Sequence, residues 1–165
     1  MLELKDCRQL TFILNGGDYG FPIYTVNEVI GLVKITHVPN TPSFIKGIIN
    51  LRGKIMPVMD LRLKFGMPES EYNERTCIII VSVKIKGEQK TMGVVVDRIS
   101  EVIDIKLDDV EAPPQYGAKD SVSFLMGIGK FKEKVIMLLN IDEVVSGEDI
   151  ASFFKQAPKE SLAKV

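Results

Sequence analysis

The stretch YGFPIYTVNEVI at residues 19–30 returns as MGVVVDRISEVI at residues 92–103, with glycine, glutamate, valine and isoleucine in matching positions. Gly20 aligns with Gly93, and Glu28 with Glu101. A pattern that recurs in register indicates that the same small unit occurs twice along the chain. We therefore expect two similar lobes with a seam between them.

Two further blocks extend the repeat. FIKGI at residues 44–48 returns as FLMGI at 124–128, and KIMPVMDL at residues 54–61 returns as KVIMLLNI at 134–141. The distance along the chain between equivalent residues is longer for these blocks (Phe44 to Phe124) than for the first pair (Gly20 to Gly93). The second copy therefore has a longer middle loop. Half of a 165-residue chain buries too little surface to be comfortably stable alone, so the two lobes should pack on each other.

Composition narrows the function classes. The chain is 45% hydrophobic and 26% charged, which is typical of a globular protein. Its net charge of -1 argues against nucleic-acid binding, which needs a basic face. The N-terminus has no signal-peptide core and no apolar run has the length of a membrane span, which predicts a cytoplasmic protein. Cys7 and Cys77 lie far apart without a second pair, so we expect reduced thiols and no zinc site.

Short β-branched and aromatic runs separated by turn residues predict an all-β fold of small barrels. The first hairpin turns at residues 15–18 and the second at residues 86–89, and continuous apolar runs indicate strands buried on both faces. Residues 9–66 are expected to form the first barrel and residues 76–145 the second. The polar segment 66–75 is the expected linker.

Helices should be few and short. Thr25 and Glu28 have the spacing of a capping box for a single turn, and Asp60 is placed to cap a turn over residues 61–65. Residues 147–157 have apolar side chains at helical spacing, which predicts a C-terminal amphipathic helix. The tail at residues 158–165 is expected to be disordered.

No set of residues indicates catalysis. His37 is the only histidine, and GIGK at residues 127–130 lacks the spacing of a phosphate-binding loop. The repeat aligns Glu28 with Glu101, and a paired-carboxylate site is the enzymatic alternative, but neither half carries the Asp-Thr-Gly or Asp-Ser-Gly of a duplicated aspartic protease. We expect a protein without enzymatic activity, cofactor or metal.

A chain-long series of motifs resembles the CheW family, the coupling proteins of bacterial chemotaxis. The motifs are DYG at residues 18–20, VNEV at 26–29, VPNTP at 38–42, FIKG at 44–47, NLRG at 50–53, PVMDLR at 57–62, GVVVD at 93–97 and FLMGIG at 124–129. Each motif alone is weak, whereas the ordered series is specific. The resemblance implies two five-stranded SH3-like β-barrels with an apolar zone between them.

The resemblance also implies a role and partners. CheW proteins bridge the cytoplasmic tip of methyl-accepting chemoreceptors to the regulatory domain of the histidine kinase CheA, so contact with the membrane is indirect, through the receptors. By this resemblance Val26, Glu28 and Arg52 are expected to bind the receptor. Cys77, Ile78 and Tyr116 are expected to bind the kinase.

One contact follows as a hypothesis: Glu28 and Arg52 form an ion pair at the seam between the barrels. Spacing alone also permits a turn arginine in water at position 52. Two alternatives to the adaptor remain open. The chain could be a detached CheW-like regulatory domain of a CheA-type kinase, or a small β-barrel nucleic-acid-binding protein.

Overall fold

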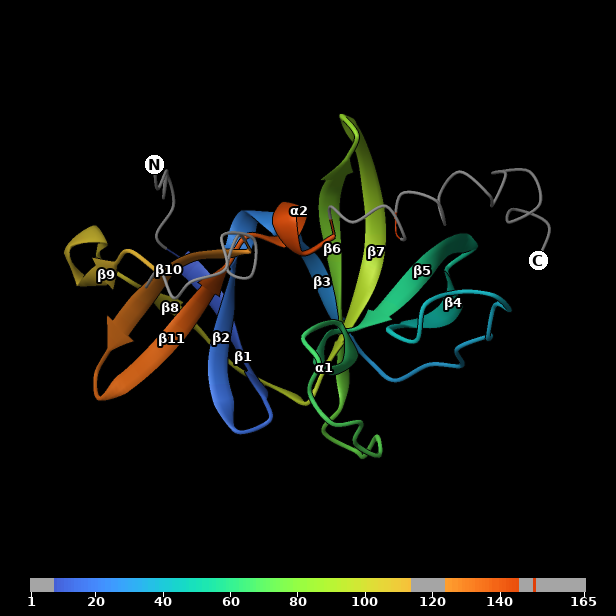
Figure 1. The fold of residues 1–165 in the computed structure, drawn as a ribbon, viewed down its shortest axis with the longest axis horizontal. Coiled ribbons are helices and arrows are strands. Elements are labelled where there is room, and N and C mark those ends of the chain that lie inside the picture. Colours follow the sequence, from blue (N-terminus) through green and yellow to red (C-terminus); the bar gives the residue numbers. More distant parts are fainter. Residues whose placement is uncertain (1–7, 114–123, 146–149, 151–165) are drawn as a thin grey trace.

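Two twisted β-sheets lie side by side, and two short helices sit between them (Figure 1). The computed structural model describes residues 8–113, 124–145 and 150. One sheet has five strands in the order β3-β6-β7-β5-β4, and the other has six in the order β8-β1-β2-β11-β10-β9. The mainly β fold with short helices confirms the predicted fold class, with one strand more than expected in the second sheet.

The strands begin and end near the turn residues of the sequence. The strands are β1 (Arg8–Leu14), β2 (Gly17–Pro22), β3 (Val26–Gly31), β4 (Ile45–Leu51), β5 (Lys54–Asp60), β6 (Cys77–Ile85), β7 (Glu88–Val96), β8 (Arg98–Asp104), β9 (Val110–Glu111), β10 (Leu125–Phe131) and β11 (Lys134–Leu139). The helical turns are η1 (Ile23–Thr25), α1 (Leu61–Lys64), η2 (Leu107–Asp109) and α2 (Ile141–Val144). Both predicted hairpins, β1–β2 and β6–β7, are present.

The strand registers show that the repeat is structural. Gly20 lies opposite Leu138 in the parallel pair β2–β11, and Gly93 lies opposite Val58 in the parallel pair β7–β5. The sequence repeat aligns Gly20 with Gly93 and Val58 with Leu138, so equivalent residues pair in both sheets. Each copy also has a β-bulge at the same place, at Gly47 in β4 and at Gly127 in β10.

The sheets do not follow the sequence halves 9–66 and 76–145, which corrects the expected barrel boundaries. The hairpin β1–β2 of the first half joins β8 to β11 of the second half, whereas β6–β7 joins β3 to β5 and β4. Each hairpin therefore completes the other copy's sheet. We call these bodies the five-stranded barrel and the six-stranded barrel.

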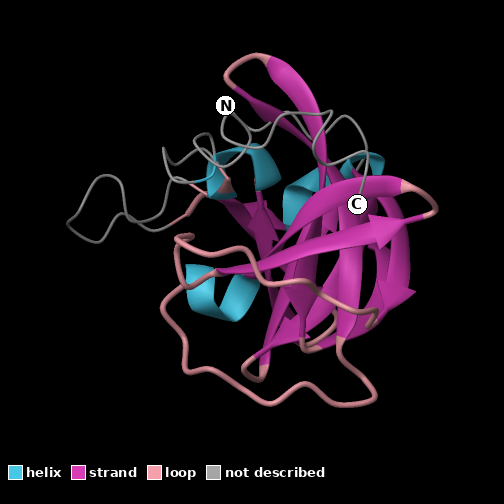
Figure 2. Cartoon of the chain, turned by 90° about the vertical axis from the view of Figure 1, so that its right-hand side faces the viewer, coloured by secondary structure: helices cyan, strands magenta, loops and turns pink. Residues whose placement is uncertain are grey.

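An isolated bridge joins Thr36, in the segment that follows β3, to Ile48 of the edge strand β4 in the five-stranded barrel. Figure 2 shows the curved strands of this barrel from the side. Gly47 permits this approach because its φ is +146°, and a Cβ there would lie 2.0 Å from the carbonyl oxygen of Thr36. No side chain fits that space, which explains the glycine of the FIKG motif.

The core has three parts, and the largest lies between the barrels. On β6, Ile79, Val81, Val83 and Ile85 pack into this seam with Leu10, Phe12, Leu14 and Phe21 of the six-stranded barrel. The alternate residues Ile78 and Ile80 pack inside the five-stranded barrel. A smaller cluster of Ile103, Ile105, Ile136 and Leu138 fills the six-stranded barrel. The predicted burial of both faces of β6 is confirmed.

The helical turns agree only in part with expectation. Asp60 caps α1 by accepting the N–H of Leu63, and Gly66 follows with a φ of +74°. The predicted capping box is wrong, because Glu28 lies in strand β3 and the Thr25 hydroxyl donates to the carbonyl of Pro22 instead. Except for buried Ile150, the predicted helix 147–157 and the tail 158–165 lie outside the described residues.

Candidate functional site

Arg52 and Glu28 form the expected ion pair. Arg52 occupies the tight turn between β4 and β5 with a φ of +53°, and the N–H of the following Gly53 donates to Oδ1 of Asn50 at 2.8 Å. From this turn its guanidinium Nη2 donates to Oε2 of Glu28 in β3. The Arg52 side chain is 68% exposed and that of Glu28 35%. The turn thus presents a cation at the surface with its orientation set by one carboxylate.

The hypothesis places this ion pair at the seam between the barrels, and that position is wrong. A β-bulge in β3 puts Val26 opposite Val81, which faces the seam, but puts Glu28 opposite Ile80, which faces the interior of the five-stranded barrel. Ile30, on the same face as Glu28, packs on that interior cluster. Glu28 and Arg52 therefore join two elements of one barrel, and Val26 packs partly against the seam core.

The chain around β3 carries exposed apolar side chains that were not among the expected binding residues. Tyr24 is 61% exposed, Val29 40%, Leu32 39% and Val33 41%. β3 is an edge strand, paired within the described part of the chain with β6 alone. Val29 was missed because the expected helical turn included it, whereas alternation along a strand would have placed it opposite to Glu28.

The expected kinase contacts fall in different environments. Cys77 is half-buried at the start of β6 between Gly31 and Val96, and its Sγ donates to the carbonyl of Arg75 at 3.2 Å. Ile78 is fully buried in the core of the five-stranded barrel, so its side chain cannot contact a partner of the folded protein. Its assignment as a surface contact is corrected on this ground. Tyr116 lies outside the described residues.

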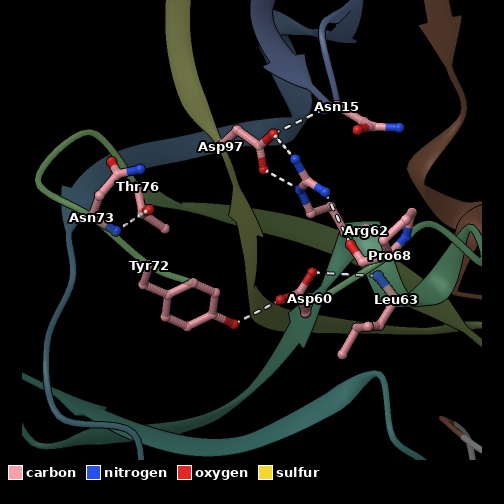
Figure 3. A network of polar contacts seen from close by, with 9 residues as sticks. All are labelled: Asn15, Asp60, Arg62, Leu63, Pro68, Tyr72, Asn73, Thr76 and Asp97. Carbon is pink, nitrogen blue, oxygen red and sulfur yellow. Dashed lines mark hydrogen bonds and ion pairs between the residues drawn. The ribbon is translucent and has the colours of Figure 1, made fainter. Parts of the chain in front are cut away.

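A polar network that the sequence did not predict lies where the chain crosses between the barrels (Figure 3). Asp97 sits between β7 and β8 and binds Arg62 of α1 in a bidentate manner, with Nε–Oδ1 at 2.7 Å and Nη2–Oδ2 at 2.8 Å. Asp97 Oδ2 also accepts the N–H of Asn15 at 2.8 Å. Burial alone would raise the pKa of Asp97, but these hydrogen bonds and the charge of Arg62 outweigh it and hold the pKa below its usual value.

A second part of the network surrounds Asp60, which is buried. The hydroxyl of Tyr72 in the linker donates to Asp60 Oδ2 at 2.7 Å. Burial, this hydrogen bond and the charge of Asp60 raise the pKa of Tyr72. Arg62 also donates to the carbonyl of Pro68 at 2.9 Å, so the linker is tied down at two points. These polar groups are engaged with one another, which favours a structural role.

The other candidates from the sequence were His37 and the aligned carboxylates of Glu28 and Glu101. His37 is exposed, and no group of three or more His, Cys, Asp or Glu residues in the described segments could hold a metal ion. Within the same segments no helix is long and apolar enough to cross a membrane. Glu101, the counterpart of Glu28, lies in β8 of the other barrel, so the two carboxylates belong to different sheets.

Comparison with known proteins places this architecture in a family. The family model of the CheW-like domain matches residues 8–149. The chemotaxis protein CheW of Klebsiella aerogenes is 34% identical over 142 residues, covering 86% of this chain and 83% of the relative. CheW of Helicobacter pylori is 31% identical, covering 81% and 78% respectively. Protein FrzA of Myxococcus xanthus is 30% identical over 128 residues, covering 76% and 77%.

A solved structure agrees with these relatives. The scaffolding protein TtCheW from Thermoanaerobacter tengcongensis superposes with a TM-score of 0.76 at 37% identity, covering 87% of this chain and 95% of that one. The repeat, the two barrels and the motif series thus have a common explanation: this chain belongs to the CheW-like family of chemotaxis scaffold proteins.

Proposed function

We propose that this protein is a non-enzymatic adaptor that couples methyl-accepting chemoreceptors to the regulatory domain of the histidine kinase CheA, acting in the cytoplasm. The observation that carries the proposal is the Glu28–Arg52 ion pair beside the exposed edge strand β3. A receptor tip is a helical hairpin, and such partners are recognised by apolar surfaces that carry a few orienting charges.

The residues near this pair suit that partner. Val26 and Glu28 are half-buried in β3, and Val29, Leu32 and Val33 expose apolar surface along the same stretch of chain. Arg52 is held by Glu28 rather than free to rotate, which lowers the entropy lost when a partner's acidic or carbonyl group binds it. Complementary charge of this kind sets orientation and association rate.

The kinase contacts are proposed from the family resemblance. Cys77 is partly exposed and lies next to Gly31 on the neighbouring strand, so a contact there would continue from the end of β3. Tyr116 is kept as the second proposed contact. The Ile78 side chain is left out because the barrel core encloses it.

The binding test is Arg52→Ala, compared with the same change at the matching position of the other copy. Lys132 is the counterpart of Arg52, in the β10–β11 turn, with a φ of +57° against +53°. Arg52→Ala should weaken binding to a receptor cytoplasmic fragment about tenfold or more in calorimetry, because losing a charged interface contact costs roughly 2 kcal/mol or more. Lys132→Ala should change it less than about twofold.

Stability separates a binding role from a folding role. Since Arg52 is 68% exposed, its substitution should lower the free energy of unfolding by no more than about 1 kcal/mol. Receptor binding that is unchanged by Arg52→Ala, or lost equally with Lys132→Ala, would remove Arg52 from the proposed site.

A further inference from the structure

The two short helices of the repeat each reach across the seam. α1 follows β5 of the five-stranded barrel, and its C-cap is Phe65. The ring of Phe65 stacks on that of Phe124, which directly precedes β10 of the six-stranded barrel, with ring centroids 4.7 Å apart. α2 follows β11 of the six-stranded barrel, and its Asp142 accepts the N–H of Lys84 in β6 at 2.8 Å. Arg62 and Asp142 are equivalent, since each directly follows the last aligned block of its copy. The same helical position therefore makes a polar contact in both copies.

The Arg62 contact is the more extensive of the two. Asp97 is the residue at which the chain passes from β7 of one barrel to β8 of the other. Its carboxylate binds Arg62 on the five-stranded side and the N–H of Asn15, in the β1–β2 turn, on the six-stranded side. Its own N–H donates to the carbonyl of Ile13 in β1 at 3.2 Å. Both barrels are thus fastened to one residue (Figure 3).

Apolar packing at the seam does not by itself fix an orientation, because burial of apolar surface is non-directional. A bidentate arginine–carboxylate pair, in contrast, tolerates little change in angle. The side chains of Arg62 and Asp97 are only 15% and 27% exposed, so this pair is less screened by solvent than five other ion pairs, each of which has a partner at least 63% exposed. Those five are Arg8–Asp104, Lys46–Glu69, Glu28–Arg52, Glu88–Lys90 and Glu111–Lys130.

We propose that Arg62 and Asp97 are positioning residues, which hold the two barrels at the relative orientation that lets receptor and kinase contacts act together. The consequence for coupling rests on the proposed adaptor function. The relative orientation of the two barrels is a property of the protein alone, so it can be measured without any partner.

The first experiment measures the distance between the barrels by pulsed electron paramagnetic resonance. Spin labels are placed at Gln89, near the tip of β6–β7, and at Lys134, at the start of β11, after Cys7→Ser and Cys77→Ser. The unsubstituted pair should give one narrow distance. Asp97→Asn and Arg62→Met should broaden the distribution at least twofold, Arg62→Lys should broaden it less, and Glu111→Gln, which removes the exposed pair with Lys130, should leave it unchanged.

Distributions that stay narrow in both Asp97→Asn and Arg62→Met would overturn the proposal. If Arg62→Met does not fold, the nearly isosteric Asp97→Asn and the charge-retaining Arg62→Lys decide the outcome. The folded state of each variant is checked by a cooperative denaturation curve.

The second experiment separates positioning from folding. Affinities of Asp97→Asn for a receptor fragment and for the CheA regulatory domain, measured separately, should stay within about twofold, while receptor-dependent control of the kinase falls at least fivefold. Parallel loss of both affinities would mean a purely structural role and would overturn the proposal. Failure of the unsubstituted protein to couple would instead refute the adaptor function, whereas the distance measurement would still report whether Arg62 and Asp97 hold the two barrels in one orientation.

Discussion

The carboxylate of Asp97 shows how one residue responds to its surroundings in the fold. Its sequence context, a single aspartate after three valines, gives no sign of a partner, because Arg62 lies far earlier in the chain. Folding brings it a guanidinium and a backbone N–H, and these favour the charged form more than burial opposes it. A contact between residues so far apart in the sequence can be identified only once the arrangement of the strands is known.

A pH dependence follows from this lowered pKa. Because the folded pKa lies below the usual 3.8, the pair's contribution to stability is complete above that value and is lost as the pH falls through the folded pKa. Denaturant unfolding should therefore show that Asp97→Asn is less stable than the unsubstituted protein at pH 7, and that the difference shrinks steadily below about pH 4. A difference that stays constant down to about pH 2 would contradict the assignment.

Among the secondary-structure elements, local sequence patterns predicted the two hairpins, the cap of α1 and the matching blocks of the repeat. Turn residues and strand alternation are local signals, so sequence alone was sufficient for them. The capping box at Thr25 failed because the local pattern also fits a strand entrance, and pairing of β3 with β6 decided between the two. The exposed side chain of Val29 was missed for the same reason.

The two copies differ in the polarity of one interior position. Gln9 in β1 corresponds to Ile78 in β6, since they pair with Pro22 and Val95, which the sequence repeat aligns with each other. Gln9 is fully buried, and within the described segments neither Oε1 nor Nε2 has a hydrogen-bond partner. An unpaired buried amide costs stability, so the six-stranded barrel has the less favourable interior.

This asymmetry predicts opposite effects of substituting the two residues. Gln9→Leu should raise the free energy of unfolding by about 1 kcal/mol, because it removes the unpaired amide. Ile78→Gln should lower it by on the order of 3 kcal/mol, because it buries an amide in an apolar cluster. Both values come from denaturant curves, and a Gln9→Leu protein less stable than the original would show that the amide is satisfied.

The sequence repeat predicted that the protein has two packed lobes, but it did not predict which strands form each lobe. The exchange of hairpins between copies depends on long-range pairings, β2 with β11 and β5 with β7, that no local pattern encodes. It also makes the seam the largest part of the core. The expected ion pair of Glu28 and Arg52 was found, but it joins two elements of the five-stranded barrel at the surface, because a bulge in β3 turns Glu28 away from the seam.

The exchanged hairpins predict that the sequence halves cannot fold alone. A fragment of residues 8–66 lacks β6 and β7, and a fragment of residues 76–145 lacks β1 and β2, so each is missing the centre of a sheet. Neither fragment should give a cooperative thermal transition by circular dichroism, whereas the full chain should unfold in one step. A fragment with a sharp transition of its own would contradict this topology.

Reconstitution shows whether this protein couples receptors to a kinase. CheA autophosphorylation is measured with a receptor cytoplasmic fragment in the presence of this protein, in its absence, and with Arg52→Ala or Lys132→Ala. We expect that receptor control of the kinase requires this protein, is lost with Arg52→Ala and persists with Lys132→Ala. A kinase rate that is the same with and without this protein would contradict this expectation.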